Sequence, residues 1–224
     1  MQGLGETPSI RWLGSKRSDS SFKERGKWGR SALVQVMCEP TTIPSSALPP
    51  QQHFHHCPRC GNPLAGPAEA NRIECSACGF LLYFNPTVAG VAFASREDGR
   101  VLFIRRAKEP GKDLLAPPGG FIDLGETAEV AVEREYREEV GLRIADVTFL
   151  CSQVNQYAYH GVLYPVLDLF FTARVVNPTA AQSLDDVSGF EWRDPLTVAE
   201  DELAFPSMKA ALRVLQARLG SARS

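Results

Sequence analysis

The sequence has no apolar run of the roughly eighteen residues that a membrane-spanning helix needs. It also lacks an excess of basic charge, because 24 Lys and Arg oppose 26 Asp and Glu, for a net charge of −2. Proteins that bind nucleic acid through a basic surface usually show such an excess. No internal repeat of solenoid length is present. We therefore expect a globular protein whose partner is neither a membrane nor a nucleic acid.

The charge is unevenly spread along the chain. Residues 1–36 hold seven Lys and Arg and three acidic residues, a net charge of +4, so residues 37–224 hold 17 and 23, a net charge of −6. The first segment is rich in Ser, Gly and Arg and has neither periodicity nor a signal-peptide core, and we expect it to be disordered. We hypothesise that it reflects an upstream start, with Met37 as the natural initiator, which mass spectrometry of the native N-terminus would test. We also expect a cytoplasmic protein.

Composition divides the chain into three parts. A Pro/Ser-rich stretch, PTTIPSSALPPQQ, ends an N-terminal segment that we place at 1–52 and expect to be disordered or extended. A short cysteine-bearing module at 53–84 follows it. A turn at Asn-Pro-Thr then opens the largest part, at 85–220.

The largest part has the pattern of a mixed α and β domain. Apolar runs at Val88–Ala94 and Arg100–Arg105 flank an Asp-Gly turn, which predicts a β-hairpin. The other expected elements are a Pro/Gly-rich loop at 114–124, a helix at 127–140, strands at 145–154, 164–176 and around 190–192, and a helix at 206–219. A mixed sheet with two helices predicts an α/β or α+β sandwich.

Four of the six cysteines form two CxxC pairs at a spacing typical of zinc ribbons: Cys57, Cys60, Cys75 and Cys78. Two such pairs deliver four thiolates to one tetrahedral Zn²⁺, and four thiolates close the coordination sphere of a structural site. A module of this size cannot hold itself together by core burial, so the metal would supply its folding energy. The alternatives are a redox-active CxxC pair or two disulfides.

The nearby histidines and the two remaining cysteines are weaker candidates for metal ligands. His53, His55 and His56 lie just upstream and are alternative ligands by residue type, but beside four cysteines we expect them to form a flexible polar edge. Cys38 and Cys151 have no partner at ligand spacing, and we expect both to be unpaired and incidental.

The helix at 127–140 carries its own boundary signals. Thr127 is a suitable N-cap and Gly141 a suitable C-terminal stop. One apolar stripe runs along it at helical spacing: Val132, Tyr136 and Val140. This stripe predicts the face that packs on the sheet.

A second face of the same helix is acidic. Glu135, Glu138 and Glu139 lie at i, i+3 and i+4, so their carboxylates emerge within about one turn. Like charges at this spacing destabilise a metal-free helix by a few tenths of a kcal/mol per pair. Mg²⁺ or Mn²⁺ would remove the repulsion and suits all-oxygen ligands. The alternative is an ordinary solvated helix face, which is the expected role of the neighbouring Glu133.

The stretch from Gly120 to Leu142 resembles the Nudix box, G-x5-E-x7-R-E-U-x-E-E-x-G-U, in which U is a bulky aliphatic residue. Every fixed position matches. The departure is Tyr136, where an aliphatic residue is usual and where we expect the ring to pack instead. The resemblance implies an α/β/α sandwich with a mixed sheet, a loop–helix–loop metal site, and hydrolysis of a nucleoside diphosphate linked to another moiety.

The resemblance also implies roles for individual residues. Arg134 would orient a glutamate, and Glu126 would support the geometry of the loop and helix. Glu138 and Glu139 would be catalytic carboxylates, one of which takes the proton of an attacking water. The implied ligands of Mg²⁺ or Mn²⁺ are Glu135, Glu138, Glu139 and the backbone carbonyl of Gly119.

A four-cysteine ribbon directly before such a domain is similar to the NADH pyrophosphatase group, and the similarity covers about residues 55–218. In that group a further Glu, six residues before a Trp, also binds metal. Here Asp186 stands six residues before Trp192, and a simple turn acid is the alternative. The group also carries the stretch SQPWPFPxS, whereas this chain continues from Ser152–Gln153 as VNQYAYHG. NADH is therefore not singled out as the substrate.

Two further pairs of residues are candidates for substrate binding. Tyr157 and Tyr159 have rings that can stack on a base, although tyrosines in such a position are as often packing residues. Arg105 and Arg106 end a strand ahead of the glycine loop and can neutralise a diphosphate. The alternative for both arginines is a solvated strand end.

The favoured function is a Mg²⁺-dependent hydrolase acting on a small nucleotide such as ADP-ribose or NAD(H), with one structural Zn²⁺. A second hypothesis keeps the metal site and assigns oxidised nucleotides or capped RNA ends as substrates. A third is a Nudix-fold sensor with the ribbon as a binding platform, which the intact glutamate set disfavours. By analogy with the family, we also expect a homodimer.

Overall fold

The computed structural model describes residues 46–64 and 71–222. The expectations for 1–45, among them disorder, the start at Met37 and an unpaired Cys38, lie outside the described residues. Residues 46–49 lead into a short 3-10 helix, η1 (Pro50–His53). Among the helices of the described part, none has the length and apolar content needed to cross a membrane.

The cysteine module contains a small antiparallel hairpin, β1 (Arg72–Glu74) and β2 (Leu81–Tyr83). Each CxxC pair is followed by a glycine in the left-handed region, Gly61 with φ 76° and Gly79 with φ 69°. In both turns the glycine N–H donates to the carbonyl of the first cysteine of the pair. Only glycine adopts this backbone without strain, which is why each pair ends in it.

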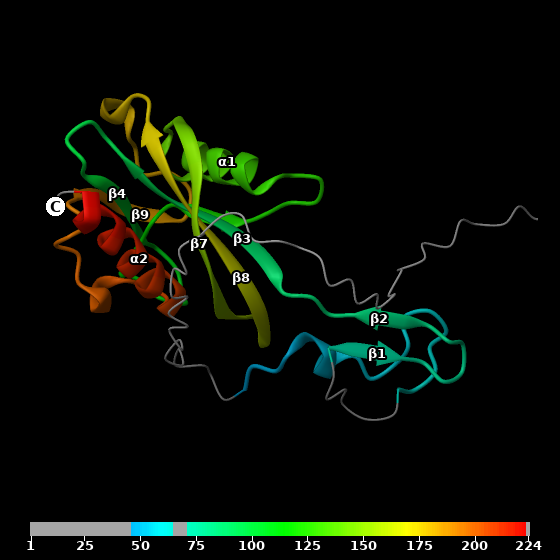
Figure 1. Cartoon of the computed structure of the whole chain (residues 1–224). Coiled ribbons are helices and arrows are strands. Elements are labelled where there is room, and N and C mark those ends of the chain that lie inside the picture. Colours follow the sequence, from blue (N-terminus) through cyan, green and yellow to red (C-terminus); the bar gives the residue numbers. More distant parts are fainter. Residues whose placement is uncertain (1–45, 65–70, 223–224) are drawn as a thin grey trace, which may run out of the picture. The chain divides into compact units, whose positions relative to one another are not determined.

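The described part of the main domain is built on a seven-stranded mixed sheet (Figure 1). Its main path runs in the order β5-β4-β3-β8-β7, while β6 pairs with β3 and β9 pairs with β4. The strands are β3 (Thr87–Ser95), β4 (Val101–Arg106), β5 (Leu115–Ala116), β6 (Gly119–Phe121), β7 (Ile144–Tyr159), β8 (Val162–Val175) and β9 (Val187–Arg193). The parallel pair in the centre is β3 with β8.

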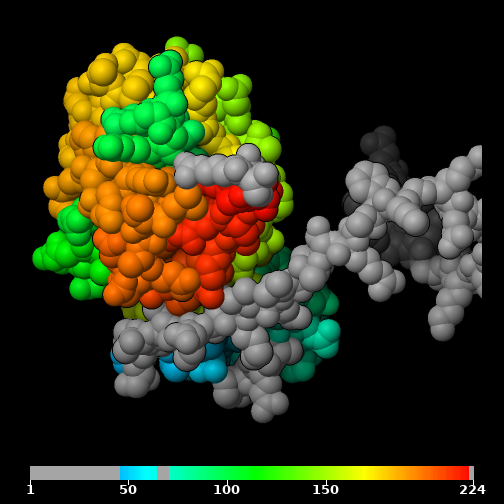
Figure 2. Space-filling model, turned by 60° about the vertical axis from the view of Figure 1, so that its left-hand side comes forward, coloured from blue at the N-terminus to red at the C-terminus, as the bar shows by residue number. Residues whose placement is uncertain are grey.

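Two α-helices cover opposite sides of this sheet, α1 (Ala128–Val140) and α2 (Pro206–Ala222) (Figure 1). The predicted α/β/α sandwich is therefore confirmed. Two short 3-10 helices, η2 (Pro178–Ala180) and η3 (Glu200–Glu202), lie in the connections around β9. Figure 2 shows α2 in red on the surface, beside the orange segment that precedes it.

The structure differs from the sequence-based expectation at the first hairpin. β3 and β4 share only the pair Ser95↔Val101 next to the turn, after which they separate. β6 occupies the edge of β3 from Ala89 to Val91 instead. The stretch expected to be a loop at 114–124 therefore contains two strands, which are too short for their residue pattern to be recognised.

Helix α1 begins and ends where its capping residues predict. The N–H of Val130 donates to the Thr127 hydroxyl at 3.4 Å, and Gly141 takes φ 68° at the C-terminus. The expected apolar stripe, which includes Tyr136, is fully buried against the sheet. A Cβ on Gly90 of β3 would lie 2.9 Å from Val132, so this glycine lets α1 approach the sheet closely.

Candidate active site

Arg134 lies at the centre of the acidic face of α1. Its Nε and Nη2 donate to the two oxygens of Glu126 at 3.0 and 3.1 Å, and its Nη1 donates to Glu135 at 2.8 Å and to Glu138 at 2.9 Å. Its Nη2 also donates to the carbonyl of Phe121 in β6 at 3.0 Å. One guanidinium therefore joins the helix, the preceding loop and the end of β6.

The two carboxyl groups nearest to Arg134 have pKa values shifted in opposite directions. The Arg134 guanidinium lowers the pKa of Glu126, and the backbone N–H of Asp123 acts in the same direction. Burial raises the pKa of Glu135, and the adjacent guanidinium opposes that rise. Glu126 is therefore held ionised in the loop, as its expected supporting role requires.

Glu139 is the most perturbed carboxyl of the acidic face. Burial and the nearby Glu135 raise its pKa to about 8, and the N–H of Gly119 and the charge of Arg106 oppose the rise. The Gly119 N–H donates to Glu139 Oε2 at 3.1 Å. Ionisation of this carboxyl is unfavourable in the protein alone, and a bound cation would stabilise the ionised form.

The glycine pair at the start of β6 leaves room for these carboxylates. A Cβ on Gly120 would lie 2.4 Å from Glu135 Oε1, and a Cβ on Gly119 would lie 2.3 Å from the carbonyl oxygen of Gly90. Any larger residue at either position would displace the glutamate or the strand. The short loop before α1 is therefore specified by contact with the acidic face as well as by backbone conformation.

The expected metal ligands are gathered on one face, but their oxygen atoms point in different directions. Glu135 and Glu138 contact Arg134, while Glu139 contacts the backbone of Gly119. In the described ranges, only the four ribbon cysteines bring three or more candidate donor atoms within 4.8 Å of one another. The Glu138 side chain is 53% exposed and so is free to rotate toward a cation.

Asp186, the expected additional ligand, lies on the loop before β9 and is exposed. Its carboxylate forms an ion pair with Lys108. The charge that reaches Glu139 from this loop belongs to the neighbouring Asp185, which adds to the rise of the Glu139 pKa. This loop therefore lies near Glu139, while the carboxylate of Asp186 is paired with a lysine.

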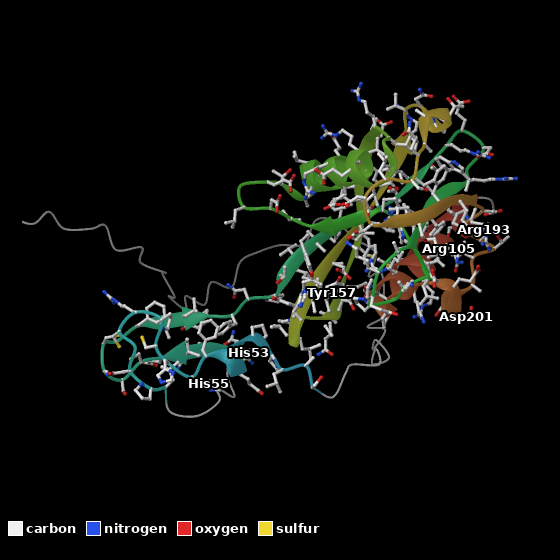
Figure 3. The ribbon with its side chains drawn as sticks, turned by 180° about the vertical axis from the view of Figure 1, so that it is seen from behind. His53, His55, Arg105, Tyr157, Arg193 and Asp201 are labelled. Atoms are coloured by element: carbon white, nitrogen blue, oxygen red, sulfur yellow. The ribbon has the colours of Figure 1, made fainter. Side chains whose placement is uncertain are left out.

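The two candidate arginines have different surroundings. Arg105 donates to Glu191 at 2.6 Å and to the carbonyl of Asp113 at 2.7 Å. Glu191 also accepts a hydrogen bond from Arg193, and Figure 3 shows Arg105 and Arg193 close together. Arg106 does not share these partners. Its Nε donates to the carbonyl of Pro110 at 2.9 Å, and its positive charge lowers the pKa of Glu139.

An aromatic cluster lies on β7 and its neighbours. The ring of Tyr157 (Figure 3) lies 5.7 Å from Phe121, 6.2 Å from Tyr159 and 6.0 Å from Phe205, between ring centroids. The Arg106 guanidinium lies 5.1 Å from the Phe205 ring centre. Tyr157 is half-buried at the centre, while Phe121 and Tyr159 are 40% and 51% exposed. The accessible rings are therefore those of Phe121 and Tyr159.

Sequence reasoning missed two of these contributors, Phe121 and Phe205. Phe121 directly follows the box glycines, and that position was a usable signal because β6 carries it to the acidic face. Phe205 comes from a distant segment, and no local pattern places it here.

The four ribbon cysteines converge on one point. Cys57 Sγ lies 3.7 Å from Cys78 Sγ, and Cys60 Sγ lies 3.6 Å from Cys75 Sγ. A tetrahedral Zn²⁺ with Zn–S bonds of about 2.3 Å has sulfur–sulfur edges of about 3.8 Å, so the spacing suits zinc. None of the nearby histidines shown in Figure 3 belongs to this group within the described residues.

The NUDIX domain family matches residues 85–214, more than half of the chain. The chain belongs to the NUDIX family. The resemblance inferred from the box at Gly120–Leu142 is thereby confirmed, together with a cysteine cluster ahead of the domain. The N-terminal boundary of the match falls at the expected start of the main domain.

The NUDIX chain resembles several characterised proteins. It is 28% identical to the NAD-capped RNA hydrolase NudC of Deinococcus radiodurans over 176 residues, which cover 77% of this chain and 59% of that protein. It is 46% identical to the ADP-ribose pyrophosphatase of Methanocaldococcus jannaschii over 63 residues, 28% of this chain and 37% of that protein. The chain therefore matches less than two thirds of the length of either relative.

A solved structure supports the fold. The NUDIX hydrolase from Nitrosomonas europaea superposes with a TM-score of 0.59 and 19% identity, over 75% of this chain and 94% of that one. At this identity the likeness establishes the shared architecture.

Proposed function

We propose that the chain is a metal-dependent hydrolase that cleaves the pyrophosphate bond of a nucleoside diphosphate linked to another moiety. ADP-ribose and NAD(H)-like dinucleotides are the favoured substrates. The observation that carries the proposal is the acidic face of α1, where half-buried Glu139 contacts the glycine strand β6 and Arg134 bonds the other carboxylates. The names of the two relatives support the same reaction class.

Mg²⁺ or Mn²⁺ fits this face because its donors are hard oxygen atoms on one side of a helix. Glu135, Glu138 and Glu139 would hold the ion together with the Gly119 carbonyl. When bound, the ion polarises the diphosphate and lowers the pKa of an attacking water. Glu138 must first release Arg134, which its exposure permits.

The chain's own groups then divide the remaining work. A carboxylate among Glu138 and Glu139 takes the proton from water. Arg134 holds Glu135 in place through its ion pair, and Glu126 fixes Arg134 in turn. Asp186 is an additional candidate ligand for the ion, and its ion pair with Lys108 would have to break before it could bind.

The aromatic cluster is proposed as the site for the base. Phe121 and Tyr159 expose rings on which a planar base can stack, and Tyr157 packs between them and Phe205. β6 is only three residues long and joins Phe121 to Gly119, so base and diphosphate would lie next to each other. A small dinucleotide fits this arrangement.

One alternative substrate has its own support. NAD attached to an RNA end contains the same diphosphate, and the Deinococcus radiodurans relative is named for that activity. RNA caps therefore belong with the candidate substrates, although nucleic acid was not expected from the net charge. Oxidised nucleotides, a sensor function, a homodimer and a cytoplasmic location stay predictions.

A substrate panel tests the proposed reaction. With Mg²⁺ present, we expect hydrolysis of ADP-ribose, NADH or NAD and, if the alternative holds, release of the NAD cap from RNA. Glu138→Gln should lower kcat by at least about a hundredfold, since a missing catalytic carboxylate removes both proton transfer and metal binding. If no compound of the panel, 8-oxo nucleotides and nucleotide sugars included, is turned over, the hydrolase assignment fails.

We propose that Arg106, whose charge acts on Glu139, contacts the diphosphate and that Arg105 does not, and a comparison of the two arginines tests this. Arg106→Ala should lower kcat/KM about tenfold or more, because a hydrogen bond to a charged group contributes about 1.5–3 kcal/mol. Arg105→Ala is the matched control and should stay within about twofold, because its guanidinium is bonded to Glu191 and Asp113. Equal losses in both variants, at equal thermal stability, would contradict the assignment of Arg106.

We propose that the ribbon holds one structural Zn²⁺. Elemental analysis should give about one zinc per chain, and Cys75→Ser should lose it together with amide protection in β1 and β2, because the metal supplies folding energy. Cys151→Ser is the control, since that thiol lies outside the four-cysteine group, and it should retain the zinc. A wild-type protein purified without zinc, or a Cys75→Ser variant that keeps it, would rule the proposal out.

A further inference from the structure

One edge of β3 has no strand partner over a short stretch. β6 pairs with β3 only as far as Val91, and β4 meets β3 only at Ser95. The backbone of Ala92–Ala94 is buried between these two points. Buried N–H and C=O groups need hydrogen-bond partners, so another part of the molecule has to supply them.

The Tyr136 hydroxyl supplies two of these partners. It donates to the carbonyl of Ala92 at 2.8 Å and accepts from the N–H of Ala94 at 3.2 Å. The ring is completely buried, and burial raises the pKa of the hydroxyl well above its usual range, so it stays a donor. A side chain of α1 therefore completes the hydrogen bonding of the sheet edge.

These bonds continue to the carboxylate of Glu139. The N–H of Ala92 donates to the carbonyl of Pro118 at 3.1 Å. The same Pro118–Gly119 peptide donates through its N–H to Glu139 Oε2 at 3.1 Å. The two bonds of the Pro118–Gly119 peptide polarise each other, whereas the Tyr136 bond acts on them through the position of Ala92. The series begins and ends on α1, three residues apart, and passes through β3 and the glycine loop.

The peptide in the middle has little freedom to move. A Cβ on Gly119 would lie 2.3 Å from the carbonyl oxygen of Gly90 and 2.7 Å from the Cα of Val91, which shows how closely this peptide lies against β3. A change in the position of Ala92 is therefore passed directly to the group that holds Glu139.

We propose that Tyr136 is a positioning residue for the metal-binding carboxylates, acting through Ala92 and the Pro118–Gly119 peptide on Glu139. The proposal rests on the metal binding proposed above. An aliphatic side chain, the usual residue of the Nudix box at this position, packs on the sheet but supplies neither hydrogen bond. In this chain the hydroxyl therefore links the sheet edge to the acidic face.

Tyr136→Phe removes the hydroxyl and keeps the ring. We expect Mn²⁺ binding, followed by electron paramagnetic resonance, to weaken about tenfold, as is typical when a group that orients a metal ligand is lost. We expect kcat to fall with little change in the KM of the substrate, because the base and diphosphate contacts are unchanged. Zinc content and thermal stability are measured on the same samples.

Val140→Ala is the control, since it removes buried volume from the same stripe without a polar group. It should lower the melting temperature yet bind Mn²⁺ as the wild type does. Wild-type affinity in Tyr136→Phe, or an equal loss in Val140→Ala, overturns the positioning role. A wild-type protein that binds no Mn²⁺ would instead contradict the proposed function itself.

Hydrogen exchange of the unmodified protein provides a second measurement if Tyr136→Phe does not fold. Saturating Mg²⁺ should slow exchange of the Ala94 amide together with that of Gly119, because both belong to the connected series. Protection that rises at Gly119 alone would show that the two ends are independent, and would overturn the proposal.

Discussion

The ion pairs of Arg134 are the interaction on which the arrangement of the site depends. Three carboxylates surround one guanidinium at 2.8–3.1 Å, and the same guanidinium bonds the backbone of β6. Without this charge the glutamates would repel one another on a helix that is otherwise packed tightly on the sheet. The loop before α1, the short strand β6 and the acidic face are therefore organised around a single side chain.

The sheet divides next to this acidic face. β3 turns away from β4 after one residue pair, and β6 with its two glycines fills the opening. Glu139 reaches the backbone of Gly119 in that opening. Phe121 lies on this strand against Tyr157, and the charge of Arg106 acts on Glu139, so metal, diphosphate and base are proposed to meet where the sheet divides.

Local patterns in the sequence predicted a large part of this. The limits of α1 follow from Thr127 and Gly141, the buried stripe from helical spacing, and the cysteine cluster from two CxxC pairs. These features depend on residues close together in the chain, so their spacing determines their geometry.

Features set by distant segments were not predictable in the same way. The separation of β3 from β4 accompanies the pairing of β3 with β6, about thirty residues further along the chain, as in Gly90↔Gly120. Arg105 and Arg106 are neighbours in sequence, yet only the register with β9 shows that the first is bonded to Glu191. The ion pair of Asp186 with Lys108 likewise joins two loops that no sequence pattern connects.

The central claim is that the acidic face of α1 binds a divalent cation. The most direct measurement is titration of Mn²⁺ into the zinc-loaded protein, followed by electron paramagnetic resonance, with a Glu135→Gln/Glu139→Gln double variant beside it. The account predicts saturable binding by the wild type and its loss in the double variant, with zinc content unchanged. Binding that is absent from the wild type, or equal in the two proteins, would contradict it.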